Sequence, residues 1–330
     1  MFGKRAKMSK NKSVYCSIAG MLIVLMFFSI FFPVSGQFVG NESPDNWHPP
    51  ENFVDPVTLK IKEFSMQGLS DDEIIVALEE LNMGWYPETG ATWIGKALTS
   101  EDEEYTKLPN RIFTGDSDSS TIFSVQRGVA IAMVDRVGRM QTGGSSWRGV
   151  SSEMSCGSMS VSSGNTLRSF LCLQIGDITS ATNWAEVVVT HNLGETCKWY
   201  TFDPDEGNWI FCGDKDTAST AVDTYVMLLD GTSDGAGYHY DVWINYGWVK
   251  RAHLSSLNVQ ACLQKEVYSE SGQFTNDVSR AVFSVNWLHN GQAWSYWTDS
   301  VNTQWGSVMP MRESHTMGSS SYNWQAWVQN

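Results

Sequence analysis

NWAEVVVT at residues 183–190 and QKEVYSE at residues 264–270 are two stretches in which the side chains alternate in character. Successive side chains of a β-strand point to opposite faces, so this period of two predicts two strands. In the first stretch, one face is formed by Trp184, Glu186, Val188 and Thr190, opposite a predicted core face of Ala185, Val187 and Val189. In the second, one face is formed by Gln264, Glu266, Tyr268 and Glu270. Each strand therefore carries a glutamate on a face that could line a groove.

The same texture continues through most of the chain. From about residue 112, short β-branched and aromatic runs are separated by Gly, Ser, Asn and Asp, and no long helical pattern interrupts them. This predicts a mainly β fold, an antiparallel β-sandwich of the concanavalin-like jelly-roll type with a groove-forming sheet. The Ser- and Gly-rich stretch 142–164 is expected to be a long loop with room for one irregular strand. Candidate strands are 121–126, 129–134, 167–175, 184–190, 198–202, 209–212, 224–229, 238–244, 248–252, 261–269, 282–288 and 293–298.

The pattern of residues 37–110 predicts a small helical module, which precedes the sandwich domain at 111–330. A short helix is expected at 57–66, ending near Gly68. A second helix is expected to begin at Ser70, because Glu73 three residues later completes a capping box, and to end at Gly84.

The first 36 residues predict an export signal or a membrane anchor. Five basic residues precede an uncharged stretch at 14–36 that contains an apolar run at 18–32 and ends in small residues. Cleavage after Gly36 fits a signal peptide, whereas the length of the stretch also fits an uncleaved anchor. Either alternative places the chain from Gln37 onward outside the cytoplasm, secreted or attached to the membrane by its N-terminal segment.

The charge of the chain argues against nucleic acid as a partner. The net charge is −14, and cleavage after Gly36 would remove five of the 22 basic residues and none of the 36 acidic ones, leaving −19. A surface this acidic repels phosphate backbones. The acidity identifies no substrate.

The spacing of the cysteines is compatible with one disulfide and with no cysteine-based zinc site. Cys197 and Cys212 bracket two expected strands joined by a turn, and an exported location would allow a bridge between them. Five cysteines follow the N-terminal segment, an odd number, so one thiol would remain. The sequence contains no CxxC pair, so it does not predict a zinc site formed by cysteines.

Other motifs in the sequence predict no metal and no cofactor. HExxH and GxGxxG are absent, and GTSDG at 231–235 is expected to be a hairpin loop, because a strand rather than a helix follows it. The histidines are scattered singly. The calcium-loop fragments around Asp203 and around Asp230 and Asp234 are explained more simply as hairpin turns.

Fifteen tryptophans allow two interpretations. Aromatic side chains on a concave sheet would bind sugars or peptides, whereas large sandwiches also bury many aromatics. We expect about two thirds of the tryptophans in the core.

Residues 165–290 resemble the glutamic peptidases, the eqolisin and neprosin groups. KEVYSE at 265–270 is similar to the eqolisin segment AEWIVE, with glutamates in the same second and sixth places, and WYTFDP at 199–204 is similar to WYEWYP. The first catalytic position is a glutamine in eqolisins and a glutamate in neprosins, and WAEVVV places Glu186 there. The eqolisin segment QTGVDF and the neprosin segment GCYN are absent. A different alignment gives the first position to Gln174, or moves it out of the pair altogether.

The resemblance implies an exported glutamic endopeptidase that acts on polypeptides without a cofactor. Glu266 would be the general base that activates a water, and Glu186 the acid that stabilises the oxyanion. Two nearby carboxylates titrate as a coupled pair, so an acidic pH optimum is expected. The module at 37–110 would be an activation peptide. The substrate groove would be lined by Trp184, Trp199, Gln264 and Tyr268.

A noncatalytic function is the alternative. A lectin-like or adhesive sandwich would use its aromatic groove to bind glycan or another polymer, and the architecture alone does not separate the two functions. In that case the two glutamates would be ordinary polar residues of a half-exposed sheet.

Overall fold

The computed structural model describes part of the chain, all of it within the unit Asn41–Asn330. The predicted signal or anchor, the candidate strand at 121–126, nearly all of the one at 129–134 and the predicted domain boundary at residue 110 lie outside the described residues. No helix in the described part is long and apolar enough to cross a membrane. The described residues are 47–109, 134–157, 167–178, 180, 182–192, 194–215, 217–269, 278–307, 311–318 and 320–328.

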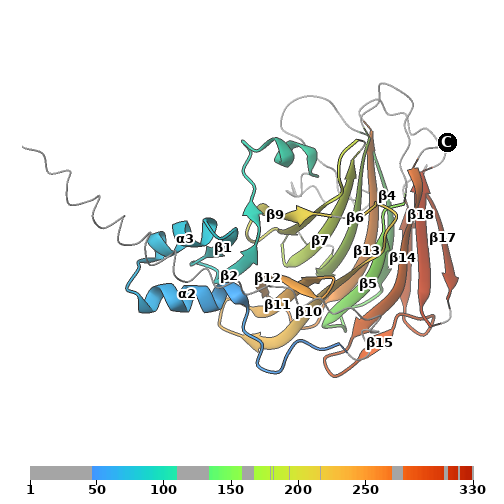
Figure 1. The fold of residues 1–330 in the computed structure, drawn as a ribbon. Helices are drawn as coiled ribbons and strands as arrows, with labels where there is room; N and C mark the ends of the chain where they lie inside the picture. Colours follow the sequence, from blue (N-terminus) through green and yellow to red (C-terminus); the bar gives the residue numbers. More distant parts are fainter. Residues whose placement is uncertain are drawn as a thin grey trace, which may run out of the picture. The chain divides into compact units, whose positions relative to one another are not determined.

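Two antiparallel sheets confirm the predicted β-sandwich (Figure 1). Sheet A follows the order β1 (Met83–Tyr86), β2 (Ala91–Ile94), β12 (Gly247–Leu254), β11 (Tyr238–Ile244), β10 (Asp223–Ser233), β5 (Gly149–Ser155), β14 (Val278–His289), β18 (Tyr322–Val328) and β17 (Met311–Met317), with β15 (Trp294–Tyr296) on β14. Sheet B follows the order β16 (Thr303–Ser307), β4 (Val134–Thr142), β13 (Gln260–Ser269), β6 (Leu167–Gly176), β7 (Trp184–Asn192), β8 (Lys198–Asp203), β9 (Asn208–Asp214) and β3 (Lys96–Ala97).

Alternation along the strands builds the core between the sheets. Val187 of β7 and Leu263 of β13 are fully buried in one cluster with Met227 of β10. The predicted core face of β7 is confirmed, since Ala185 and Val189 belong to the same cluster. Fully burying an aliphatic side chain of this size contributes about 1.5–3 kcal/mol, so the parity of each strand is strongly fixed.

The two predicted helices are present as α2 (Pro56–Met66) and α3 (Asp71–Glu79). The Asp55 side chain accepts a hydrogen bond from the backbone N–H of Thr58 at 2.8 Å, which caps α2. The predicted capping box of α3 is confirmed, because the Ser70 N–H donates to the Glu73 carboxylate at 2.9 Å. The helices bury apolar side chains against the outer face of sheet A, including Val226 and Trp243.

The helical module also contributes strands to both sheets. α3 ends at Glu79, and Gly84, the predicted stop of the helix, lies in β1 instead. The Trp93 ring fills the place of a Gly84 side chain, since a Cβ there would lie 2.1 Å from it. β1 and β2 extend sheet A, β3 pairs with β9 of sheet B, and the single turn η2 (Glu103–Lys107) follows. Residues before the predicted boundary are thus paired with strands after it.

Strand β5 lies inside the stretch 142–164, where a long loop with one irregular strand was expected. It pairs with β10 and β14 in the middle of sheet A. Val150 and Met154 point into the core, whereas the residues between them are small or polar. The serines hid the alternation from the sequence pattern.

The predicted disulfide between Cys197 and Cys212 is not formed, and both are free thiols. The reason is the register of the hairpin that joins β8 to β9. The carbonyl of Cys197 accepts a hydrogen bond from the N–H of Lys215, so Cys197 lies opposite a residue three positions beyond Cys212. The Cys197 thiol instead interacts with Cys156.

Candidate active site

Both predicted glutamates lie on the outer face of sheet B, opposite the core. Strand β6 separates their strands, and its Gln174 is registered with Glu186 on one side and Cys262 on the other. Glu266 is registered instead with Phe170, which pairs with Thr190. The predicted sharing of a face is therefore observed.

The register does not place the two glutamates opposite each other. They are two strands apart, and Glu266 lies four residues along β13 from Cys262, the residue level with Glu186. With strands about 4.8 Å apart and a rise of about 3.4 Å per residue, the two Cα atoms are separated by roughly 16 Å. The residue that faces Glu186 directly is Gln174, the alternative first position.

Glu186 and Gln174 form a buried pair at the centre of the sheet. The Gln174 Nε2 donates to Glu186 Oε2 at 2.9 Å. The exposed fractions of the two residues are 0% and 1%. The other polar atom of the amide, Gln174 Oε1, is buried and accepts no hydrogen bond from the described residues. The pair thus combines a carboxylate with an amide whose Oε1 can still accept a hydrogen bond.

Glu266 belongs to a second polar group further along the same face. Tyr268 donates to Glu266 Oε2 at 2.6 Å, and the amide of Gln264 donates to Glu266 Oε1. Arg139 Nε of β4 donates in turn to Gln264 Oε1 at 2.9 Å. Two of the four predicted groove residues, Gln264 and Tyr268, are therefore direct partners of Glu266.

The other two predicted groove residues, Trp184 and Trp199, lie on opposite faces of sheet B. Trp184 lies on the outer face, where it is buried beside Phe202 with ring centroids 5.7 Å apart. Trp199 lies on the opposite face, and its indole N–H donates to Tyr225 in the core at 3.0 Å. The reason is parity: Trp199 is registered with Val189, which points inward.

Cys262 lies between the two carboxylates, in the same row as Gln174. Burial raises the pKa of its thiol to about 12; Arg139 opposes this shift, and Glu186 and Glu266 add to it. A thiol with such a pKa stays protonated at neutral pH and is a poor nucleophile.

A pocket of about 140 Å³ opens next to this row. It lies between β4 and β16, and Arg139, which contacts Gln264, forms part of its wall. The polar face therefore continues into a hollow at one edge of the sheet. Its lining residues are Val137, Arg139, Gln141, Gln304, Trp305 and Gly306.

The segment 98–109 of the N-terminal module covers part of the same face. Leu98 and Leu108 pack against Trp184 and Val188 in one apolar cluster. Ion pairs hold the segment at both ends of η2: Lys198 to Glu104 at 2.6 Å, and Lys107 to Glu195. Burial acts to raise the pKa of Glu104, but Lys198 and Lys107 outweigh it and lower the pKa.

A buried charged cluster lies away from this face, at the turn after β8. Lys250 Nζ donates to Glu206 at 2.6 Å, and Tyr240 donates to Asp203 at 2.7 Å. Burial, and after it the charge of Glu206, raise the pKa of Asp203 to about 7. Asp203 also forms the predicted hairpin turn between β8 and β9, because its Oδ1 accepts a hydrogen bond from the N–H of Asp205 at 2.9 Å.

The tryptophans are mainly structural, as the core interpretation predicts. Nine of the fifteen are buried and the other six are half-buried, so none offers a fully exposed stacking surface. The clusters on both outer faces and between the sheets contain them. The glycan-binding alternative receives no support from their placement.

Comparisons with known proteins relate the chain to other sandwiches. No family model matches it, and no curated protein matches it. A structure of scytalido-glutamic peptidase with a peptide-based transition state analog is 14% identical, covers 60% of this chain and 100% of that chain, and has a TM-score of 0.39.

Two further solved structures are similar to this chain at lower TM-scores. SCP-B, a member of the eqolisin family of peptidases in a complex with the tripeptide Ala-Ile-His, is 13% identical over 60% of this chain and 100% of that chain, with a TM-score of 0.36. The carbohydrate binding module CBM66 from Bacillus subtilis is 12% identical over 42% of this chain and 88% of that chain, with a TM-score of 0.25. These similarities concern the fold and assign no role to any residue.

Proposed function

We propose that this chain is an exported, glutamic-type endopeptidase in which Glu186 and Gln174 form the catalytic pair. The observation that carries the proposal is their direct hydrogen bond of 2.9 Å on the polar face of sheet B. The substrate would be a polypeptide. This assignment moves the centre of the site from the pair Glu186 and Glu266 to the pair that the register brings together.

The chemistry follows from the two functional groups. Glu186, as a carboxylate, would accept a proton from a water molecule, whose oxygen attacks the carbonyl carbon of the scissile bond. Gln174 Oε1, which accepts no other hydrogen bond, would orient the water, and the amide N–H would stabilise the oxyanion. The proton on Glu186 would then pass to the nitrogen of the leaving amine, which restores the carboxylate.

In this proposal Glu266 would bind the substrate and would not activate the water. Its group with Gln264 and Tyr268 lies two side-chain rows along β13 from the catalytic row, toward Val137 in the wall of the pocket. An extended peptide laid across the strands would reach both groups. Glu266 therefore would bind the substrate chain through its polar groups.

The chain described here would be a latent form. Glu186 and Gln174 are buried, and the segment 98–109 packs on their side of the sheet. A substrate would reach the pair only after this segment has left, which agrees with the predicted activation peptide. Acid would favour its departure, because protonation of Glu104 and Glu195 removes the carboxylates of two ion pairs.

Self-cleavage and casein digestion test the proposal, measured from about pH 3 to about pH 7, where carboxylates titrate. The wild-type chain is expected to lose the segment before about residue 112 in acid and then to digest casein. Glu186→Gln and Gln174→Ala should do neither, whereas the exposed control Glu79→Gln should behave as the wild type. A wild-type chain that shows no proteolysis but binds a glycan array would replace the proposal with the binding alternative.

A further inference from the structure

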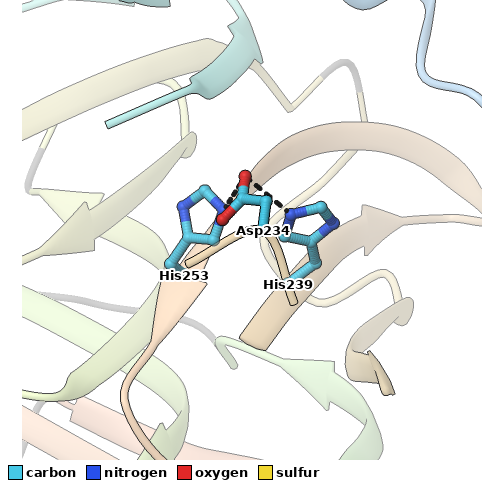
Figure 2. A group of neighbouring side chains, drawn as sticks. All are labelled: Asp234, His239 and His253. Carbon is cyan, nitrogen blue, oxygen red and sulfur yellow. Dashed lines mark hydrogen bonds and ion pairs between the residues drawn. The ribbon is translucent and has the colours of Figure 1, made fainter. Parts of the chain in front are cut away.

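Three side chains that the sequence scatters meet on the outer face of sheet A (Figure 2). His239 of β11 and His253 of β12 are direct cross-strand partners. Asp234 lies in the hairpin between β10 and β11, and its Oδ2 is 3.1 Å from Nε2 of each histidine. One donor atom from each residue lies within 4.8 Å of the others.

A second group of residues orients His239. Thr232 donates its hydroxyl proton to Asp230 Oδ1 at 2.6 Å, so the hydroxyl can only accept from His239 Nδ1, which is 3.0 Å away. Arg251 donates to the same Asp230 at 3.2 Å. The proton of a neutral His239 is thereby held on Nδ1, and its Nε2 lone pair faces Asp234.

This arrangement points two imidazole nitrogens at one carboxylate oxygen. The Nε2 atom of a neutral His239 lies 3.1 Å from Asp234 Oδ2, a contact that is favourable when a cation lies between the two atoms. His253 Nε2 points at the same oxygen. A metal cation would satisfy all three atoms at once, and the hydrogen bond to the far nitrogen of a histidine is the usual way in which a metal ligand is oriented.

The ligand types and spacing fit zinc. Zinc binds histidine nitrogen at about 2.0–2.1 Å and carboxylate oxygen at about 2.0–2.2 Å, which puts neighbouring ligand atoms of a tetrahedron roughly 3.3 Å apart. The two distances of 3.1 Å are close to this value. The side chains of His239 and Asp234 are 18% and 48% exposed, so an ion can enter and a water can take the fourth position.

We propose that Asp234, His239 and His253 bind one divalent metal ion of the zinc class, with its fourth coordination position open to solvent. The ion would fasten the β10–β11 hairpin to β12. It would also lie beside the β1–β2 turn of the N-terminal module, where a Cβ on Gly90 would be 3.7 Å from His253 Cε1. The site is independent of the proposed peptidase pair, which lies on the other sheet.

Zinc titration of the full chain after treatment with a chelator tests the proposal. The wild type is expected to bind one zinc ion, and Co²⁺ at the same site should give the visible bands of a tetrahedral complex. His253→Ala and Asp234→Asn should abolish both signals. Thr232→Val, which removes only the orienting hydroxyl, should weaken zinc binding by about 10–100-fold.

Two controls keep the test independent of folding. His315→Ala removes an exposed histidine of β17 and should bind zinc like the wild type. Zinc at 100 times its dissociation constant should lower the unfolding equilibrium constant of the wild type about 100-fold, and should leave that of His253→Ala unchanged. A wild type that binds no zinc, or equal binding by His253→Ala and His315→Ala, would overturn the proposal.

Discussion

The carboxylates on the outer face of sheet B and those buried between the sheets have different partners. On sheet B, Glu186 accepts a hydrogen bond from the neutral amide of Gln174. Between the sheets, Glu206 accepts from the ammonium group of Lys250, and both side chains are almost completely buried. The ion pair of Glu206 with Lys250 is a structural element, whereas Glu186 and Gln174 are the proposed catalytic pair. Removing the partner should therefore harm stability in one region and activity in the other.

The largest effect is expected at the ion pair. Lys250→Met leaves Glu206 buried without its cation and should lower the free energy of unfolding by about 3–5 kcal/mol. Urea denaturation measures this loss. The double variant Lys250→Met with Glu206→Met should recover most of it, and Lys60→Met, at an exposed pair with Glu63, should cost at most about 1 kcal/mol.

The next effect depends on pH and concerns Asp203. Its carboxyl is protonated in both states below about pH 4 and ionised in both above about pH 7; between these values the folded state retains a proton that the unfolded state has lost. Stability contributed by Asp203 therefore falls as the pH rises through this window. As the pH rises through this window, the free energy of unfolding of Asp203→Asn should increase relative to that of the wild type. The total increase should be about 1.4 kcal/mol for each pH unit between the ordinary pKa of Asp203 and its raised value.

Urea denaturation of both proteins at several pH values checks this difference. The comparison between variants is needed because burial lowers the pKa of His191 and His289 to about 4, and these groups destabilise the fold as the pH falls. The two histidines contribute equally to the pH dependence of stability in the wild type and in Asp203→Asn, so their contribution cancels in the difference. A difference between the two proteins that does not change with pH would mean that Asp203 has an ordinary pKa.

A smaller effect on stability is expected at the proposed catalytic pair. Gln174→Ala removes a hydrogen bond from buried Glu186 and should cost about 1–3 kcal/mol of stability. Its turnover of a peptide substrate should fall by about 10²–10³, as when an oxyanion donor is lost. Circular dichroism and steady-state kinetics separate the two effects. Equal turnover in the wild type and the variant would remove Gln174 from the site.

The smallest effect is expected at the covering segment. The pair between Lys198 and Glu104 is partly exposed, with exposed side-chain fractions of 18% and 30%, so Lys198→Met should change stability by only about 0.2–1 kcal/mol. It should nevertheless speed limited proteolysis within residues 98–109, because one of the ion pairs that holds the segment is gone. Unchanged proteolysis would show that the apolar contacts alone retain it.

The sequence predicts faces better than partners. Alternation correctly assigned Val187 to the core and Glu186 to the outer face, because a strand residue has only two directions to point. It could not predict that Glu186 faces Gln174, since register depends on how distant strands align. For the same reason the disulfide between Cys197 and Cys212 was predicted but is not formed, and the meeting of His239 with His253 was missed.

Kinetics of two matched variants, Glu186→Gln and Glu266→Gln, test the central claim most directly. Both replace a buried glutamate on the same face of sheet B by its neutral isostere. If Glu186 is the general base, its variant should lose about 10²–10⁴-fold in kcat, whereas Glu266→Gln should mainly raise KM. Full kcat in Glu186→Gln together with a lost kcat in Glu266→Gln would contradict the assignment.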